Sequence, residues 1–207
     1  MKVAIVNYGM GNLASVRRVF EDLGASPFIA EAPASLADAD RIVLPGVGAF
    51  PAAMHNLTQQ GWCDALQHLV VGRRKPLLGI CLGMQLLASR GEEGNPTDGL
   101  GFIDGTVKRL DAIGCALRIP HVGWNQITHV PDEPMFARIP QESDFYFVHS
   151  FAFAPAAADS VSAFTDYGAH VVAAVRHQNI WGVQFHPEKS SKAGRQLLQN
   201  FLDYASC

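Results

Sequence analysis

The first half of the chain alternates short apolar runs with segments of helical periodicity, and this order limits the folds open to it. Apolar runs that predict strands lie at residues 3–6, 26–30, 41–44 and 76–80. Apolar residues three and four positions apart predict helices at residues 13–23, 62–70 and 84–90. Gly24 ends the first helix and Pro45-Gly46 ends the third strand. Strands that alternate with helices predict a parallel sheet covered on both faces.

The second half of the chain has a different pattern. Residues 91–101 carry four glycines and a proline and are expected to form a loop. Short strands are predicted, with few helices between them, at residues 106–110, 126–130, 145–148, 161–164, 171–175 and 181–185. A final amphipathic helix is predicted at residues 193–202. The fold class is therefore α/β, with three layers, a mostly parallel central sheet and an additional, partly antiparallel set of strands, and residues 1–207 are expected to form one domain.

Composition excludes several classes of function. The net charge is −3 and the basic residues are scattered, so neither a nucleic-acid partner nor an acidic membrane surface is expected. The apolar run at residues 3–6 is far shorter than a secretion signal or a membrane span, which predicts a cytoplasmic protein. The histidines show no ligand spacing, and neither a metal nor another cofactor is expected. Free thiols are expected at Cys63, Cys81, Cys115 and Cys207.

Cys81 stands in a G-x-C-x-G element between a predicted strand and a predicted helix. This is the cysteine form of a nucleophile elbow, in which a tight turn lifts the reactive side chain clear of the sheet. Gly79 and Gly83 are expected where a Cβ would not fit. The start of the following helix would favour the thiolate, and the Leu82 N–H would donate to an oxyanion. The alternative is a small buried cysteine in the core, and that interpretation suits Cys63 better.

His186 is the expected catalytic base. It follows the apolar segment that ends at Phe185, and Pro187 favours an extended conformation at the residue before it. In an extended chain, residues two apart point the same way, so the Glu188 carboxylate would contact one imidazole nitrogen and orient the ring. The alternative is an ordinary turn with a solvated glutamate.

The glycine-rich segment Pro45-Gly46-Val47-Gly48 follows a strand of the predicted parallel sheet. Carboxyl ends of parallel strands gather at one edge, where open α/β proteins bind ligands. The N–H of Val47 or Gly48 is therefore expected to be a second oxyanion donor beside Cys81, unless the segment is only a glycine turn.

These three elements, in this order, resemble the class I glutamine amidotransferases of the triad type. The resemblance implies that the chain hydrolyses the side-chain amide of glutamine through a thioester on Cys81 and releases ammonia. More specific stretches resemble the glutaminase subunits of imidazole glycerol phosphate synthases. They are residues 7–13, 45–50, 78–87, 120–125, 146–150 and 182–191. One departure is Phe151, where a tyrosine is expected after the serine.

The resemblance also implies roles for individual residues. Glutamine would be held by Gly46, Gly48, Gln85 and Ser150. A partner subunit would be contacted by Asn12, His121, Trp124, Tyr146 and Lys189. That partner is a separate (β/α)8-barrel cyclase, which uses the ammonia to make imidazole glycerol phosphate and AICAR in histidine biosynthesis.

Three other functions remain open on the sequence alone. The chain could serve another synthase, of the pyridoxal phosphate, GMP or anthranilate type. It could be a cysteine hydrolase without glutamine specificity. It could also be a non-catalytic scaffold, although the complete set of Cys81, His186 and Glu188 argues against that.

Overall fold

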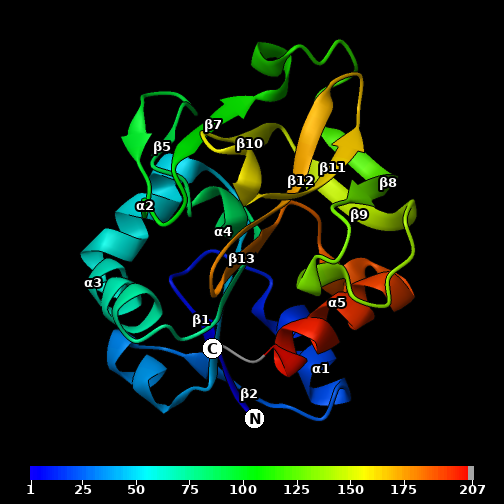
Figure 1. The fold of residues 1–207 in the computed structure, drawn as a ribbon. Helices are drawn as coiled ribbons and strands as arrows, with labels where there is room; N and C mark the ends of the chain where they lie inside the picture. Colours follow the sequence, from blue (N-terminus) through cyan, green and yellow to red (C-terminus); the bar gives the residue numbers. More distant parts are fainter. Residues whose placement is uncertain (205–207) are drawn as a thin grey trace.

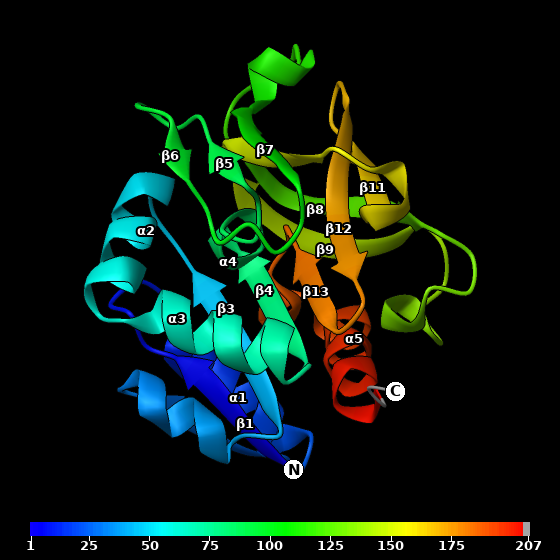
Figure 2. The same cartoon turned by 60° about the vertical axis from the view of Figure 1, so that its left-hand side comes forward.

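A nine-stranded mixed sheet forms the centre of the computed structural model, which describes residues 1–204 (Figures 1 and 2). Its first five strands are parallel and run in the order β2 (Ser26–Ala30), β1 (Lys2–Val6), β3 (Arg41–Gly46), β4 (Leu77–Cys81), β13 (Ile180–Val183). The sheet continues with antiparallel β12 (His170–His177), β11 (Val161–Asp166), β8 (His121–His129) and β9 (Ser143–His149). The predicted α/β class is confirmed, and most of the antiparallel set extends the central sheet.

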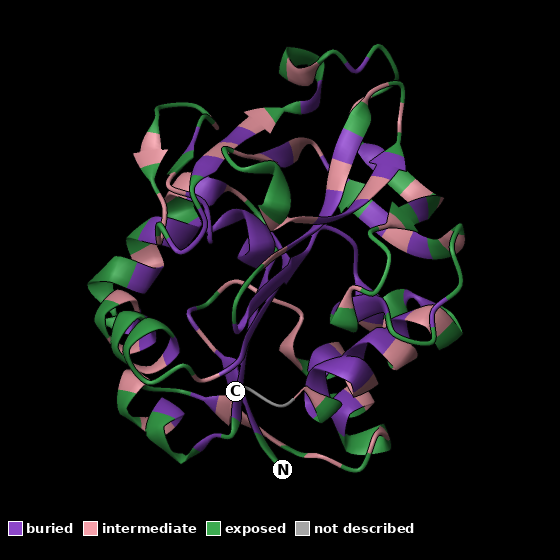
Figure 3. Ribbon diagram, viewed as in Figure 1, coloured by how far each residue is buried: buried purple, intermediate pink, exposed green. Residues whose placement is uncertain are grey.

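Helices cover both faces of the parallel strands (Figure 2). On one face, α1 (Leu13–Asp22) and α5 (Ser191–Asp203) pack against the strand residues that include Val3 and Ile5. The other face is covered by α2 (Phe50–Gln59), α3 (Trp62–Leu66) and the π-helical turn Gln67–Gly72. These helices pack against the strand residues that include Ala4 and Val6. Side chains of β1 thus alternate between two apolar layers, and the central strands β3, β4 and β13 are buried throughout (Figure 3).

A second sheet lies beyond the carboxyl ends of the parallel strands. It has four strands, in the order β10 (Phe151–Pro155), β7 (Gly105–Arg109), β5 (Arg90–Gly91), β6 (Thr97–Asp98). Strand β10 was not predicted, and the predicted loop at residues 91–101 contains β6 and the end of β5. This sheet contributes one wall of the site described below.

The helix expected at residues 84–90 is wrong in extent. The observed α4 spans only Leu82–Gln85, and the chain then turns into β5. The carbonyls that a longer helix would use are occupied, because the N–H groups of Leu100 and Phe102 donate to Leu86 and Leu87 at 2.8 and 2.9 Å. Tertiary pairing therefore ends the helix. Strand β3 also differs from expectation, since it continues through Pro45 and Gly46.

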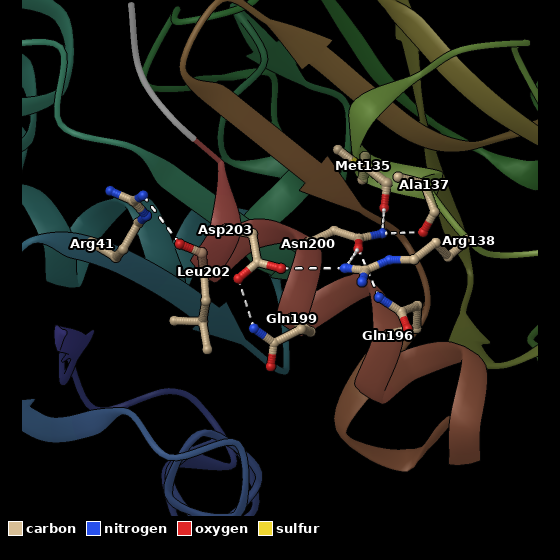
Figure 4. Close-up of polar contacts among 9 residues, drawn as sticks. All are labelled: Arg41, Met135, Ala137, Arg138, Gln196, Gln199, Asn200, Leu202 and Asp203. Atoms are coloured by element: carbon tan, nitrogen blue, oxygen red, sulfur yellow. Dashed lines mark hydrogen bonds and ion pairs between the residues drawn. The ribbon is translucent and has the colours of Figure 1, made fainter.

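The C-terminal helix is fixed by polar contacts along its last turns (Figure 4). The buried guanidinium of Arg41 donates to the carbonyls of Phe201 and Leu202, each at 3.2 Å. Asn200 donates to the carbonyls of Met135 and Ala137 at 3.0 and 2.7 Å. Since α5 directly follows the segment that carries His186 and Glu188, these contacts also hold the site.

Within residues 1–204, no helix is long and apolar enough to cross a membrane.

Candidate active site

Cys81 occupies the strained turn that its sequence motif predicts. It lies between the end of β4 and α4 and has a φ of +55°, a conformation that residues other than glycine rarely adopt. A Cβ on Gly79 would come 2.6 Å from the Gly83 carbonyl oxygen, and a Cβ on Gly83 would come 1.8 Å from that of Leu44. Both glycines are therefore required by close backbone approach. Because α4 has a single turn, it supplies a much weaker dipole than the helix expected from the sequence.

A cavity of about 350 Å³ opens beside Cys81 at the carboxyl edge of the parallel strands. Most of the residues expected to act on glutamine line it, although they come from both sheets and both halves of the chain. The lining consists of Val47, Gly48, Cys81, Leu82, Gln85, Glu93, Pro120, Val148, His149, Ser150, Phe151 and His186. The volume suits a single small ligand.

His186 reaches the cavity from the strand next to Cys81. In the parallel pairing of β4 with β13, Ile80 stands opposite Val183, so the segments after both strands start at the same edge. The strand ends at Val183, earlier than expected, and Pro187–Lys189 form a 3-10 turn. His186 is extended, as Pro187 predicts. Its Nδ1 lies 2.8 Å from Glu188 Oε1, and both side chains are almost fully buried.

The electrostatics of this pair follow from its neighbours. Burial lowers the pKa of His186, but the Cys81 sulfur and the Glu188 carboxylate outweigh that effect and raise the pKa to about 9. Within the described residues, His186 Nε2 has no hydrogen-bond partner. The Cys81 sulfur instead lies 3.8 Å from the Val148 carbonyl oxygen and 3.8 Å from Gln184 Nε2. Thiol and imidazole therefore share the cavity without a direct hydrogen bond.

The Pro45–Gly48 segment borders the cavity opposite the elbow. Gly46 pairs in register with Cys81, and Val47 and Gly48 line the cavity with exposed backbone. Gly48 has a φ of +111°, which favours glycine. Gly46 itself is buried and does not line the cavity, because the Tyr8 hydroxyl and Leu82 occupy the space where its side chain would lie. Its expected contact with glutamine is therefore replaced by a packing role.

Gln85 and Ser150 both line the cavity, as expected, and Gln85 is tied to the protein through its amide nitrogen. Gln85 Nε2 donates to the Phe151 carbonyl and to Gln184 Oε1, each at 2.9 Å. Only its oxygen thus remains to accept from a ligand. Phe151, the departure from the family pattern, forms part of the same wall.

Three polar residues of the site were missed by sequence reasoning. Glu93 is the one acidic side chain among the residues that line the cavity, and its Oε2 accepts from the Phe50 N–H at 2.7 Å. His149 lines the cavity, and burial lowers its pKa to about 3. Gln184 is buried against Cys81. Gln184 and His149 had a sequence signal, because they stand in the family-like stretches 182–191 and 146–150.

The residues expected to contact a partner do not all share one surface. Register pairs Val122 with Val148 and Trp124 with Tyr146, so these four side chains lie on the outer face of β8 and β9. The Lys189 ammonium lies 5.7 Å from the Tyr146 ring centroid, beside this face. Asn12, at the start of α1, is half-buried.

The expectation that His121 faces a partner is wrong for this structure. His121 points to the inner face of β8, is 2% exposed, and stacks between Phe147 and Tyr167 with ring centroids 4.7 and 3.9 Å away. Its Nδ1 lies 3.0 Å from His149 Nε2. It therefore lies behind the cavity-lining residue His149 rather than on an exposed surface.

Fold and site together define an α/β protein built around a cysteine elbow, with a carboxylate-paired histidine in the segment that follows the adjacent strand. A family model described as glutamine amidotransferase class-I matches residues 4–205. The imidazole glycerol phosphate synthase subunit HisH 1 of Campylobacter jejuni (strain RM1221) is 46% identical over 97% of this chain and 98% of that protein. The HisH subunit of Moorella thermoacetica is 45% identical over 96% of this chain and 93% of that protein.

Among solved structures, a chain of PurLQS from Thermotoga maritima superposes with a TM-score of 0.77. It is 17% identical, with 98% of this chain and 98% of that chain covered, and so supports the fold alone. The chain belongs to the class-I glutamine amidotransferase family and, within it, to the HisH group of imidazole glycerol phosphate synthase subunits. The resemblance inferred from the sequence motifs is confirmed.

Proposed function

We propose that this chain hydrolyses glutamine to glutamate and ammonia at Cys81 and delivers the ammonia to a cyclase subunit in histidine biosynthesis. The observation that carries the proposal is one cavity that collects the Cys81 thiol, the carboxylate-paired imidazole of His186 and the Val47-Gly48 backbone. Membership of the HisH group favours this synthase over the pyridoxal phosphate, GMP and anthranilate types. Residues 1–207 act as one glutamine amidotransferase domain, since residues of both sheets line the cavity.

The first chemical step forms the thioester. Because its pKa is raised to about 9, His186 holds a proton near pH 7 and stabilises the thiolate form of Cys81. The sulfur attacks the side-chain amide carbon of glutamine, and the carbonyl electrons move onto oxygen. That oxyanion accepts from the N–H of Leu82 and from that of Val47 or Gly48. The carbon–nitrogen bond then breaks, His186 gives its proton to the nitrogen, and ammonia leaves.

The second step releases glutamate. His186 is now neutral and accepts a proton from a water that attacks the thioester carbon. The carbon–sulfur bond breaks, the new carboxyl group loses its proton to solvent as glutamate departs, and the thiolate is restored beside the imidazolium. Glu188 keeps the Nδ1 hydrogen in place through both steps and balances the positive charge of the ring.

The polar groups of the cavity fit the amino-acid end of glutamine. The Glu93 carboxylate is suited to the α-ammonium, and the oxygen of Gln85 is free to accept a further hydrogen bond. Ser150 and Gly48 complete the contacts. An uncharged substrate would leave the Glu93 carboxylate with its contact to the Phe50 N–H but without a cationic partner in the cavity.

The partner is a (β/α)8-barrel cyclase that docks over the mouth of the cavity. Val47 and Val148 line the mouth and are exposed, and Val122 and Trp124 continue this apolar surface, so a partner seated there would exclude water. Exclusion matters because ammonia that enters neutral water is protonated and loses its nucleophilic lone pair. With Asn12, Tyr146 and Lys189, this surface forms the interface. A cytoplasmic site of action accords with the free thiols of Cys63, Cys81 and Cys115.

A coupled assay tests the proposal. We expect little glutamate from the isolated chain and strong stimulation by the cyclase and its ligand, because docking aligns the Pro45–Gly48 peptides. Cys81→Ala should abolish glutamine hydrolysis yet still bind the cyclase. Glutaminase activity retained by Cys81→Ala would assign the reaction to another nucleophile, and ammonia-dependent turnover with a different synthase would identify a different partner.

A further inference from the structure

Gln184 is a buried amide beside the nucleophile that the reaction steps above do not use. It follows β13, is fully buried, and places Nε2 at 3.8 Å from the Cys81 sulfur. The other polar contact of the sulfur is the Val148 carbonyl oxygen, also at 3.8 Å. A carbonyl only accepts and therefore suits the thiol, whereas an amide N–H only donates and therefore suits the thiolate.

The orientation of this amide is dictated by a backbone carbonyl. The Phe151 carbonyl can only accept, so the Gln85 side-chain atom 2.9 Å from it must be the nitrogen. The same nitrogen lies 2.9 Å from one end of the Gln184 amide, which must therefore be the oxygen. The end that faces Cys81 is then the nitrogen, and rotating the amide by 180° would set two nitrogens against each other.

We propose that Gln184 is a positioning residue that donates its amide N–H to the Cys81 sulfur and stabilises the thiolate before glutamine binds. The inference rests on the proposed role of Cys81 as nucleophile. A thiolate in a buried elbow needs donors, because an uncompensated buried charge is costly. The His186 imidazolium balances the thiolate charge across the cavity, but within the described residues the hydrogen bonds of the sulfur are those to Val148 and Gln184, and of these two only Gln184 brings a donor.

Other titratable groups lie near the sulfur and remain when Gln184 is changed. His186, His149 and Glu93 line the same cavity, and Tyr8 lies behind it beside Gly46. Glu188 acts through His186. A change at Gln184 that displaces the pH profile of Cys81 can therefore be assigned to the lost donor, provided that the fold is kept.

Alkylation of the isolated chain by iodoacetamide, followed at each cysteine peptide by mass spectrometry over a pH series, tests this role. Gln184→Leu removes the donor. We expect Cys81 to react about tenfold more slowly near neutral pH. Gln184→Glu keeps an acceptor for Gln85 but replaces the donor with an anionic oxygen, so Cys81 should react more slowly still in this variant.

Two controls separate positioning from unfolding. Cys115 is as buried as Cys81, and its sulfur donates to the Tyr167 carbonyl, so it reports loosening of the fold within the same sample. Asn179→Leu removes a buried amide just before β13, where it donates to the Val70 and Lys75 carbonyls, and should leave the Cys81 profile unchanged.

A wild-type profile for Cys81 in both Gln184 variants, with Cys115 still protected, would overturn the proposal. If Cys115 becomes reactive in Gln184→Leu, that variant has lost part of its fold and cannot test the proposal. The result for Gln184→Glu is then used instead, because this variant preserves the hydrogen bond with Gln85. No glutamine is present in this experiment, so its result is independent of the proposed reaction. Failure of the proposed function would appear separately, as absence of ammonia production with the cyclase.

Discussion

Gly83 packs its Cα directly against the Leu44 carbonyl, where an added Cβ would lie 1.8 Å from the oxygen. The contact joins the elbow after β4 to the middle of β3, which continues into the Pro45–Gly48 segment. Neither backbone can move without separating the nucleophile from the proposed oxyanion donors. A single glycine thus sets the spacing between two parts of the site.

Gly83→Ala should therefore be among the most damaging single substitutions in the chain. Forcing the start of α4 away from β3 should lower the free energy of unfolding by about 3 kcal/mol. Urea denaturation measures the loss. Gly72→Ala is the matched control, because a Cβ there would meet no atom closer than 3.9 Å. Equal stability of the two variants would show that the elbow tolerates displacement from β3.

Glu188→Gln tests the charge on the orienting residue with little change of shape. Glutamine can still accept from His186 Nδ1, but the negative charge that helps to hold the imidazolium is lost. We expect the rate of glutamine hydrolysis with the cyclase to fall by about 10²- to 10⁴-fold. Binding of the cyclase should be unchanged, which a titration can verify. A wild-type rate would mean that Glu188 acts by packing alone.

The raised pKa of His186 makes stability depend on pH. The pKa is 6.5 when the ring is unperturbed and about 9 in the folded chain, so the folded state binds the proton more tightly. This stabilisation is fully present below pH 6.5 and is lost as the pH rises through 9. The gap in unfolding free energy between wild type and His186→Gln should shrink by about 3 kcal/mol over that window. If the difference in unfolding free energy between the two proteins stayed constant over this pH range, the raised pKa of His186 would be contradicted.

His121→Phe tests the imidazole pair behind the cavity. His149 Nδ1 donates to the Phe151 carbonyl at 2.8 Å, so neutral His149 accepts at Nε2 and His121 must donate from Nδ1. Phenylalanine keeps the stacked ring but removes that donor, which should cost about 1–3 kcal/mol of stability by leaving a buried acceptor unpaired. Thermal and urea denaturation report the change. Tyr167→Phe loses a solvent-exposed hydrogen bond from the hydroxyl to the Arg118 carbonyl, and because water can replace that bond the variant should be less destabilised than His121→Phe.

Most of the fold could be predicted from apolar periodicity, because the strands are buried runs and the helices are amphipathic. The segment after Gln85 could not. Leu86, Leu87 and Ala88 continue an apolar pattern without a breaker, yet their carbonyls accept from residues 100–103, and no local signal encodes that pairing. Cys81, His186 and Glu188 were predictable because each stands in a local motif. The contacts that join those motifs, made by Gln184, His149 and Glu93, depend on which strands become neighbours.

The spacing of residues in the sequence already argued against placing both His121 and Trp124 at a partner interface. His121 and Trp124 are three positions apart, and in a strand such residues must point to opposite faces. Once β8 is known to run from His121 to His129, only one of them can face a partner. Trp124 is the residue that can face a partner, because its side chain is 55% exposed whereas His121 is buried.

Trp124→Ala should therefore weaken binding of the cyclase while leaving the chain itself intact. The indole is exposed and contacts Tyr146 edge-on, at 6.0 Å between ring centroids, so its removal creates no cavity in the core. Loss of a central aromatic anchor typically costs about 2 kcal/mol of binding free energy, roughly a thirtyfold rise in Kd. Calorimetric titration with the cyclase measures this loss of affinity.

Val71→Ala is the control for Trp124→Ala, since Val71 is also exposed but lies before β4, at the opposite end of the strand from the cavity. Equal affinity of the two variants would move the interface away from the outer face of β8 and β9.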